Sequence, residues 1–181
     1  MVSKKSEDLL VWIDLEMTGL DPETCAIVEL AMILTDPELN QVAEPLELAI
    51  WQPDSVLEQM DPFVRDMHTG SGLLERVRAS QVSVAQAEIE VMKLLTQHCG
   101  YRRGRLAGNS IGQDKRFIAR YMPLLDGYLH YRVLDVSTVK ELARWWHHVE
   151  FHKPTDGQHT ALVDIQNSIA ELAYYRGKVF R

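Results

Sequence analysis

Two carboxylates interrupt an apolar run near the beginning of the chain. Asp14 and Glu16 lie two residues apart in a segment that starts at Leu9 and has the composition of a buried strand. In a strand, residues i and i+2 point to the same face, with Cα atoms roughly 6–7 Å apart. Two buried like charges are costly unless a cation or a proton neutralises them. The pair therefore indicates either a cation site or a strand end that has reached solvent.

Two further acids and a histidine stand where loops enter predicted helices. Asp114 falls in the first turn of a helix, where a carboxylate also suits the helix dipole. His159 precedes the last predicted helix, and Asp164 lies one turn into it beside an apolar stripe. A histidine in this position is more often structural or solvated, whereas an acid at the edge of a buried face is harder to explain without a function.

A set of oxygen ligands without cysteine favours Mg²⁺ or Mn²⁺ over zinc. Two such ions about 3.5–4 Å apart can clamp a phosphodiester and activate a water molecule. A histidine, with an unperturbed pKa of about 6.5, is a suitable base for that water. The residue types therefore favour metal-assisted hydrolysis of a phosphate ester.

The elements that position these residues follow an α/β pattern. Apolar and β-branched runs predict strands at 9–15, 26–35, 46–51, 105–109 and 132–136. Capping residues and helical periodicity predict helices at 71–77, 83–98, 113–122, 137–147 (capped by Ser137) and 161–177. Three meandering strands followed by βα units imply a mixed five-stranded sheet flanked by helices. Ligands in such sheets bind at strand carboxyl ends, where Asp14 and Glu16 lie.

Composition limits the classes of protein that remain. A chain of 181 residues with 46% hydrophobic and 25% charged residues is typical of one globular domain, expected over 9–181 after a disordered lead-in at 1–8. No apolar stretch reaches transmembrane length, and the amino terminus lacks a secretory h-region. Two cysteines without CxxC spacing fit a reducing cytoplasm. The net charge of −7 disfavours bulk binding to a long nucleic acid, but not a short anionic substrate in one local site.

Five stretches that span nearly the whole chain resemble one family. WIDLEMTGLD, HTGSGL, GNSIGQDKRF, HYRVLDVSTVKELARWW and AELAYYR are similar to motifs of DEDDh exonucleases, and most closely of the oligoribonucleases. The resemblance implies an RNase H-like fold, a single exonuclease domain and a homodimer. It also implies a two-metal 3′→5′ exoribonuclease that degrades short single-stranded RNA, especially dinucleotides, to 5′-mononucleotides. The metal ligands would be Asp14, Glu16, Asp114 and Asp164, and His159 would be the general base.

The segment His130-Tyr131-Arg132 precedes the fifth predicted strand. From the residues alone, Arg132 is a possible phosphate ligand and Tyr131 a stacking surface, or the segment is an ordinary exposed strand start. The resemblance implies that the segment caps the 5′ phosphate together with Ser110, and that Tyr131 reaches in from the partner subunit. A site closed at one end would explain a preference for dinucleotides.

The resemblance also implies contacts to the bases. Leu20 matches the family's wedge between the two bases. Phe63 stands where many members carry Trp, which lines the base pocket; a phenylalanine still stacks, with less area. His68 is a further candidate for substrate contact, although a loop histidine is often incidental. Val163 departs from members that carry a second acid before the catalytic one, without an expected catalytic consequence.

Several conspicuous residues have structural explanations. Asp135 suits a helix cap, and Trp145-Trp146 suits either the core or a dimer surface. Arg102, Arg103 and Arg105 fit a solvated loop better than a nucleic-acid patch. Two rival functions remain: a DNA-directed DEDDh exonuclease, and a catalytically inactive nucleic-acid-binding module on the same fold.

Overall fold

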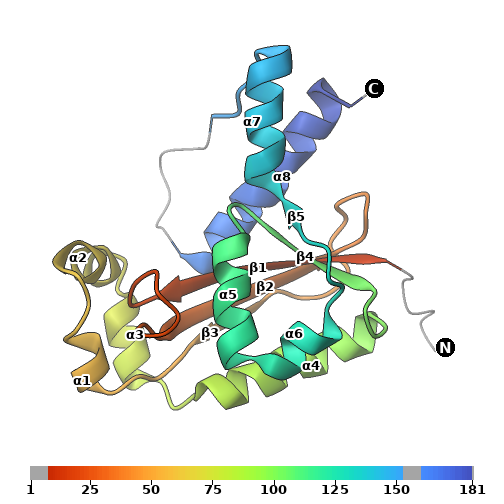
Figure 1. Cartoon of the computed structure of the whole chain (residues 1–181). Coiled ribbons are helices and arrows are strands. Elements are labelled where there is room, and N and C mark those ends of the chain that lie inside the picture. Colours follow the sequence, from red (N-terminus) through yellow and green to blue (C-terminus); the bar gives the residue numbers. More distant parts are fainter. Residues whose placement is uncertain (1–7, 153–159, 181) are drawn as a thin grey trace.

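A mixed sheet of five strands organises the molecule (Figure 1). The computed structural model of the chain describes residues 8–152 and 160–180, so all of the predicted lead-in at 1–8 except Asp8 lies outside the described residues. The strand order is β3-β2-β1-β4-β5, with β1 in the centre. β1 pairs antiparallel with β2 and parallel with β4, which confirms the predicted mixed sheet. The strands are β1 (Leu9–Met17), β2 (Ile27–Thr35), β3 (Leu46–Ala49), β4 (Gly104–Gly108) and β5 (Leu134–Asp135).

Helices cover both faces of this sheet. They are α1 (Asp54–Leu57), α2 (Pro62–Gly70), α3 (Leu73–Ala79), α4 (Val84–His98), α5 (Gly112–Tyr121), α6 (Pro123–Tyr128), α7 (Val136–His147) and α8 (Ala161–Lys178). α7 and α8 lie together on one side of the sheet, and α4 and α6 lie on the other (Figure 1). None of the helices in the described ranges combines the length and the apolar character that a membrane span needs.

Two helix starts differ from the prediction. α2 was expected to be loop, but the side chain of Asp61 accepts a hydrogen bond from the N–H of Phe63, and Pro62 occupies the first helical position. α7 is capped by Asp135, whose side chain accepts from the N–H of Ser137, so the predicted cap at Ser137 is wrong and the structural role of Asp135 is confirmed. Ser137 is thereby one residue inside the helix, and its hydroxyl is available for other contacts.

Alternate residues of β1 face different helical layers. Ile13 belongs to the core shared with α4 and α5, whereas Trp12 packs against Ile165 of α8 on the opposite face. Because side chains alternate along a strand, Asp14 and Glu16 point to the same face as Trp12. The two acids therefore face the layer that contains α8.

β1 extends beyond the end of its pairing with β4. The register with β4 ends at the pair Trp12 and Ala107, whereas β1 continues to Met17. Gly108 passes so close to β1 that a Cβ atom there would lie 3.2 Å from the carbonyl oxygen of Ile13. The chain then leaves the sheet and enters α5. On the edge that faces β4, a loop and a helix therefore border the last part of β1, whereas β2 pairs with it on the other edge.

The close approach at Gly108 gives a stability prediction. Gly108→Ala should destabilise the fold by about 1–3 kcal/mol, because the new methyl group meets backbone as well as the Ile111 side chain. The matched control is Gly127→Ala in α6, where an added Cβ meets nothing within 4 Å. That change should be neutral or stabilise by up to about 1 kcal/mol. Urea denaturation measures both, and equal stabilities for the two variants would contradict the close approach of β4 to β1.

Candidate active site

Three carboxylates meet at the carboxyl end of β1. One ligand oxygen from each of Asp14, Glu16 and Asp164 lies within 4.8 Å of the other two. Asp14 and Glu16 come from β1, and Asp164 comes from the first turn of α8. Residues 150 positions apart in the sequence thus converge on one point. The donor set consists of carboxylate oxygens, which fits a hard divalent cation such as Mg²⁺ or Mn²⁺.

The fourth acid, Asp114, borders this cluster and contacts the same strand. Its Oδ1 accepts a hydrogen bond from the N–H of Leu15 at 3.0 Å, and the side chain is buried. Leu15 lies past the end of the pairing with β4, so the carboxylate takes the place of a strand partner. Asp114 is not among the three acids within 4.8 Å of one another, but its charge helps to raise the pKa of Asp14.

Burial and nearby negative charges raise the pKa values of Asp14, Glu16 and Asp114. Desolvation, followed by the charges of Asp114, Glu16 and Asp164, raises the pKa of Asp14 to about 9. Desolvation, followed by the charge of Glu29, raises the pKa of Glu16 to about 7. Burial also raises the pKa of Asp114 to about 7, against the hydrogen bond from Leu15. A bound cation would stabilise the ionised form of these carboxylates and offset their repulsion.

A buried glutamate that the sequence analysis missed fixes the start of α8. Glu29 of β2 is fully buried and lies opposite Glu16 in the β1–β2 register. Its Oε2 accepts from the N–H of Ala161 at 3.3 Å, and its Oε1 pairs with Arg76 at 2.5 Å. The sequence signal for Glu29 is that it is an acid within the apolar run of 26–35. Glu29 ties the first residue of α8 to the sheet, one turn before Asp164.

The predicted base, His159, lies outside the described residues. The next residue, Thr160, is the N-cap of α8, and its hydroxyl accepts from the N–H of Val163 at 3.4 Å. The described part of the chain therefore begins again at the cap of the helix that contains Asp164.

His68 lies in helix α2 and is buried, rather than in an exposed loop. Its Nε2 is 2.9 Å from the carbonyl oxygen of Met17, and its Nδ1 is 3.9 Å from Oε2 of Glu16. A carbonyl oxygen only accepts, so Nε2 bears the hydrogen in this contact and Nδ1 faces the carboxylate. His68 thus connects α2 to the end of β1 and to one acid of the cluster.

A hollow of about 200 Å³ opens beside Glu16. Its walls come from the turn after β1 and from α2, and include Met17, Leu20, Val64 and Met67. Leu20 is 73% exposed at the turn, and the side-chain amide of Gln113 donates a hydrogen bond to its carbonyl oxygen. Phe63, next to Val64, is 76% exposed. The turn after β1 and helix α2 thus each present an exposed apolar side chain.

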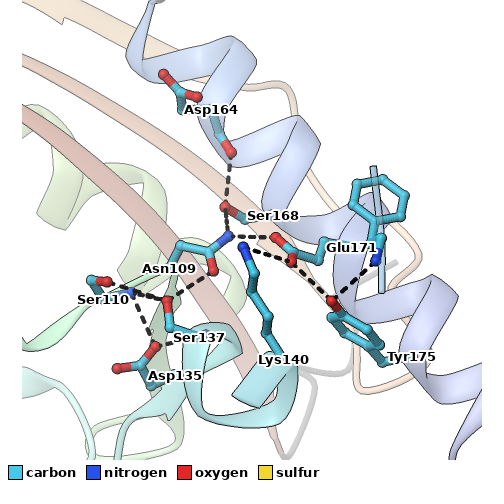
Figure 2. Close-up of polar contacts among 10 residues, drawn as sticks. Asn109, Ser110, Asp135, Ser137, Lys140, Asp164, Ser168, Glu171 and Tyr175 are labelled. Carbon is cyan, nitrogen blue, oxygen red and sulfur yellow. Dashed lines mark hydrogen bonds and ion pairs between the residues drawn. The ribbon is translucent and has the colours of Figure 1, made fainter. Parts of the chain in front are cut away.

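Ser110 lies in the loop between β4 and α5 and has an unusual backbone. Its φ is +51°, in the left-handed region that costs energy for a residue other than glycine. Its N–H donates to Oδ1 of Asp135 at 3.0 Å and to Oγ of Ser137 at 2.9 Å (Figure 2). The hydroxyl groups of Ser110 and Ser137 are 3.2 Å apart. Ser137, which was expected only to cap a helix, therefore belongs to this polar loop.

The segment His130-Tyr131-Arg132 lies at the other end of β1. Ala107 pairs with Trp12 on one side and with Leu134 on the other. Tyr131, three residues before Leu134, therefore lies roughly 10 Å from that level towards the amino ends of the strands. The acids of β1 lie beyond Trp12 in the opposite direction. The structure thus does not bring Tyr131 to the acids of its own chain.

The side chains of this segment stack on one another. The rings of His130 and Tyr131 are stacked with centroids 4.6 Å apart, and the Arg132 guanidinium lies 5.3 Å from the centre of the Tyr131 ring. Tyr131 is 68% exposed. Trp145 and Trp146 of α7 are also exposed, so the alternative that places them in the core is wrong.

Comparisons with known proteins place the chain in a class and then in a family. The family model for exonucleases (RNase_T) matches residues 11–172. A solved structure of ExoI from E. coli with single-stranded DNA has a TM-score of 0.73 over 95% of this chain, at 19% identity. The chain spans 40% of the length of that protein, so this likeness shows the fold alone, an RNase H-like exonuclease fold. Fold and acid cluster thus define a nuclease of the exonuclease class.

Relatives that align over nearly the whole chain narrow this class. Oligoribonuclease from Marinobacter nauticus is 53% identical over 175 residues, which are 96% of this chain and 97% of the relative. Oligoribonuclease from Vibrio cholerae is 51% identical over 179 residues, 97% of this chain and 98% of the relative. The chain therefore belongs to the oligoribonuclease family and is a hydrolase.

The raised pKa values predict that the acids destabilise the metal-free fold. The pKa of Asp14 is about 9 in the folded protein against an ordinary 3.8, so the folded state binds the proton more tightly than the unfolded state does. This group therefore favours folding at low pH, and its contribution is lost as the pH rises from about 4 to about 9. In EDTA, the melting temperature should fall between about pH 6 and about pH 8, and Asp14→Asn should remove much of that fall.

Scanning calorimetry measures this effect. Relief of about 1 kcal/mol would raise the melting temperature by about 2–4 °C at pH 8. Asp66→Asn, at an exposed acid of α2, is the matched control and should leave the pH dependence unchanged. A lower melting temperature for Asp14→Asn at pH 8 would mean that no repulsion exists to be relieved.

Proposed function

We propose that this protein is a 3′→5′ exoribonuclease that degrades short single-stranded oligoribonucleotides, especially dinucleotides, to 5′-mononucleotides. The proposal rests on the cluster of Asp14, Glu16 and Asp164 beside an apolar hollow. These acids repel a phosphodiester unless cations are bound between them. The two relatives named oligoribonuclease, which align over nearly the whole chain, support RNA and short substrates.

Two divalent ions, Mg²⁺ or Mn²⁺, would be held by Asp14, Glu16, Asp114 and Asp164. When bound, ions of this kind polarise the phosphodiester and lower the pKa of water. The chain's part is to hold the four carboxylates in place. Glu29 and Arg76 fix the helix of Asp164, and the N–H of Leu15 fixes Asp114.

His159 would take the proton from the attacking water. An unperturbed imidazole titrates at about pH 6.5, so the neutral form that accepts a proton is abundant near pH 7. The anchor between Ala161 and Glu29 supports this role, because it fixes the backbone two residues after His159. The same anchor fixes Asp164, which the reaction would need beside the base.

The hollow next to Glu16 would receive a base. Leu20 would separate the two bases of a dinucleotide, and Phe63 would stack on one of them. Their exposure supports these roles, since both side chains are free to contact a ligand. His68, which lies 3.9 Å from Glu16 and holds the end of β1 through Met17, would contact the substrate beside that acid.

Ser110 would cap the 5′ phosphate, and the segment of His130, Tyr131 and Arg132 would complete the cap from the partner subunit of a homodimer. The strand register supports the use of a partner, because Tyr131 and the acids of the same chain extend in opposite directions from the level of Trp12. A cap at the 5′ end would limit the site to two nucleotides.

We also propose that the homodimer acts in the cytoplasm. The exposed side chains of Tyr131, Trp145 and Trp146 supply aromatic surface of the kind that is enriched in interfaces. The chain has two cysteines, Cys25 and Cys99, without CxxC spacing, which suits a reducing compartment.

A substrate series tests the proposed activity. With Mg²⁺ or Mn²⁺ present, kcat/KM should be at least about tenfold higher for a diribonucleotide than for a DNA dinucleotide or a long single strand. A site closed at one end favours a substrate of one length. Quantification of released mononucleotide measures it. Faster cleavage of the long strand, or of the DNA dinucleotide, would favour the DNA-directed exonuclease instead.

Metal removal and Asp14→Ala are the controls for this series. Each should lower the rate by about a hundred- to a thousandfold, because charge stabilisation at the phosphate is lost. Activity that survives both would refute the metal site. Absence of cleavage in the wild-type protein with either metal would favour the inactive binding module.

The partner contact gives a separate prediction. Tyr131→Ala should lower kcat/KM for the diribonucleotide by about tenfold or more, which corresponds to one lost hydrogen bond to a charged group. The melting temperature should stay within about 2 °C, because the side chain is 68% exposed. Mixing Tyr131→Ala with Asp14→Ala subunits should restore part of the activity, since one mixed site then has both intact residues. No change in the Tyr131→Ala enzyme would remove the partner cap from the account.

A further inference from the structure

A buried hydrogen-bond network connects the helix of Asp164 to the loop of Ser110. Figure 2 shows Asn109 at its centre, between residues of α8 on one side and residues of α7 on the other. The following members come from the β4–α5 loop, from β5, from α7 and from α8: Asn109, Ser110, Asp135, Ser137, Lys140, Ser168, Glu171 and Tyr175. The metal chemistry proposed above does not use Glu171, although this acid is 1% exposed.

Glu171 is one of two acceptors that orient the amide of Asn109, and the other is Ser168. Oε2 of Glu171 accepts from Nδ2 of Asn109 at 3.0 Å, and its Oε1 accepts from the hydroxyl of Tyr175 at 3.3 Å. Nζ of Lys140 lies 4.0 Å from Oε1. A carboxylate offers only acceptors, so the NH₂ group of Asn109 must face α8 and its carbonyl oxygen must face α7.

The second amide hydrogen of Asn109 connects to Asp164. Nδ2 of Asn109 donates to Oγ of Ser168 at 2.9 Å, and the Ser168 hydroxyl donates to the carbonyl oxygen of Asp164 at 2.8 Å. One side chain of the loop thus contacts α8 at two successive turns. The position of the loop is thereby fixed relative to the helix of a predicted metal ligand.

The carbonyl oxygen of Asn109 fixes the hydroxyl of Ser137. Ser137 donates its single hydroxyl hydrogen to Oδ1 of Asn109 at 3.0 Å. Oγ of Ser137 can then only accept, and it accepts from the N–H of Ser110 at 2.9 Å. In the 3.2 Å contact between the two hydroxyl groups, the hydrogen therefore belongs to Ser110. The hydroxyl hydrogen of Ser110 can turn towards an anion, whereas that of Ser137 is donated to Asn109.

We propose that Glu171 and Asn109 are positioning residues that hold Ser110 as a hydrogen-bond donor to the 5′ phosphate and so create the preference for 5′-phosphorylated dinucleotides. This inference rests on the proposed function, in which Ser110 belongs to the phosphate cap. The network also stabilises the left-handed backbone of Ser110, because the N–H of that residue donates to both Asp135 and Ser137. Without Glu171, the NH₂ group of Asn109 loses one of its two acceptors, and only Ser168 still holds it on the side of α8.

The test compares two diadenylates, one with a 5′ phosphate and one with a 5′ hydroxyl. In Glu171→Met, kcat/KM for the phosphorylated substrate should fall about tenfold, the value of one hydrogen bond to a charged group, while the 5′-hydroxyl substrate changes less than about threefold. Glu171→Gln retains an acceptor for Asn109 and should restore most of the preference. Glu75→Met, at an exposed glutamate of α3, is the matched control and should behave as wild type.

Four outcomes would overturn the inference. An equal loss on both substrates would show that Glu171 only supports the fold, and a Glu171→Gln variant as impaired as Glu171→Met would show that its charge, not its hydrogen bond, matters. A wild-type enzyme that does not distinguish the two substrates would refute the phosphate cap itself, and the inference with it. If the wild type distinguishes the two substrates and Glu171→Met has the same ratio of kcat/KM values for them, the inference is overturned while the phosphate cap stands.

Amide hydrogen exchange gives a measurement that does not depend on activity. The N–H of Ser110 should exchange at least about tenfold faster in Glu171→Met, because its acceptor Ser137 is no longer held by Asn109. The N–H of Ile118, in the core of α5, should keep its wild-type rate. Unchanged exchange at Ser110 would contradict the proposed positioning.

Discussion

Repulsion among partly buried carboxylates at the end of β1 is the constraint on which the rest of the structure depends. Asp14 and Glu16 are held by the strand, and Asp164 is brought to within 4.8 Å of them by α8. Such a cluster opposes folding unless protons or cations occupy it. The surrounding contacts hold these acids in place against their repulsion, because the arrangement would otherwise relax by movement of α8.

The contacts that resist this movement come from several elements. Glu29 binds the first N–H of α8 and is itself neutralised by Arg76. Farther along α8, Ser168 and Glu171 bind Asn109, which connects the helix to the loop of Ser110. A single helix therefore supports the predicted metal site at its first turn and the predicted phosphate cap at its second and third turns. Because one helix supports both, the predicted metal site and the predicted phosphate cap are held at a fixed distance from each other.

Much of the fold and part of the site could be predicted from the sequence, because they depend on local patterns. Alternation in β1 predicted that Asp14 and Glu16 share a face, and helical periodicity predicted Asp164 one turn into α8. Glu29 and Glu171 were missed because the meaning of each depends on partners far away in the sequence, Arg76 for one and Asn109 for the other. The cap of α7 was misjudged because Asp135 and Ser137 are both suitable capping residues, and only the geometry selects between them.

The central claim is that the acids at the end of β1 form a divalent cation site. Titration of the metal-free protein with Mn²⁺, followed by electron paramagnetic resonance, tests it directly. We expect the signal of free Mn²⁺ to stay suppressed until about two ions per chain are bound, with spin coupling between neighbouring ions, as for two-metal sites about 3.5–4 Å apart. Asp14→Asn should abolish the coupling. A free Mn²⁺ signal that rises in proportion from the first addition to the wild-type protein would contradict the account.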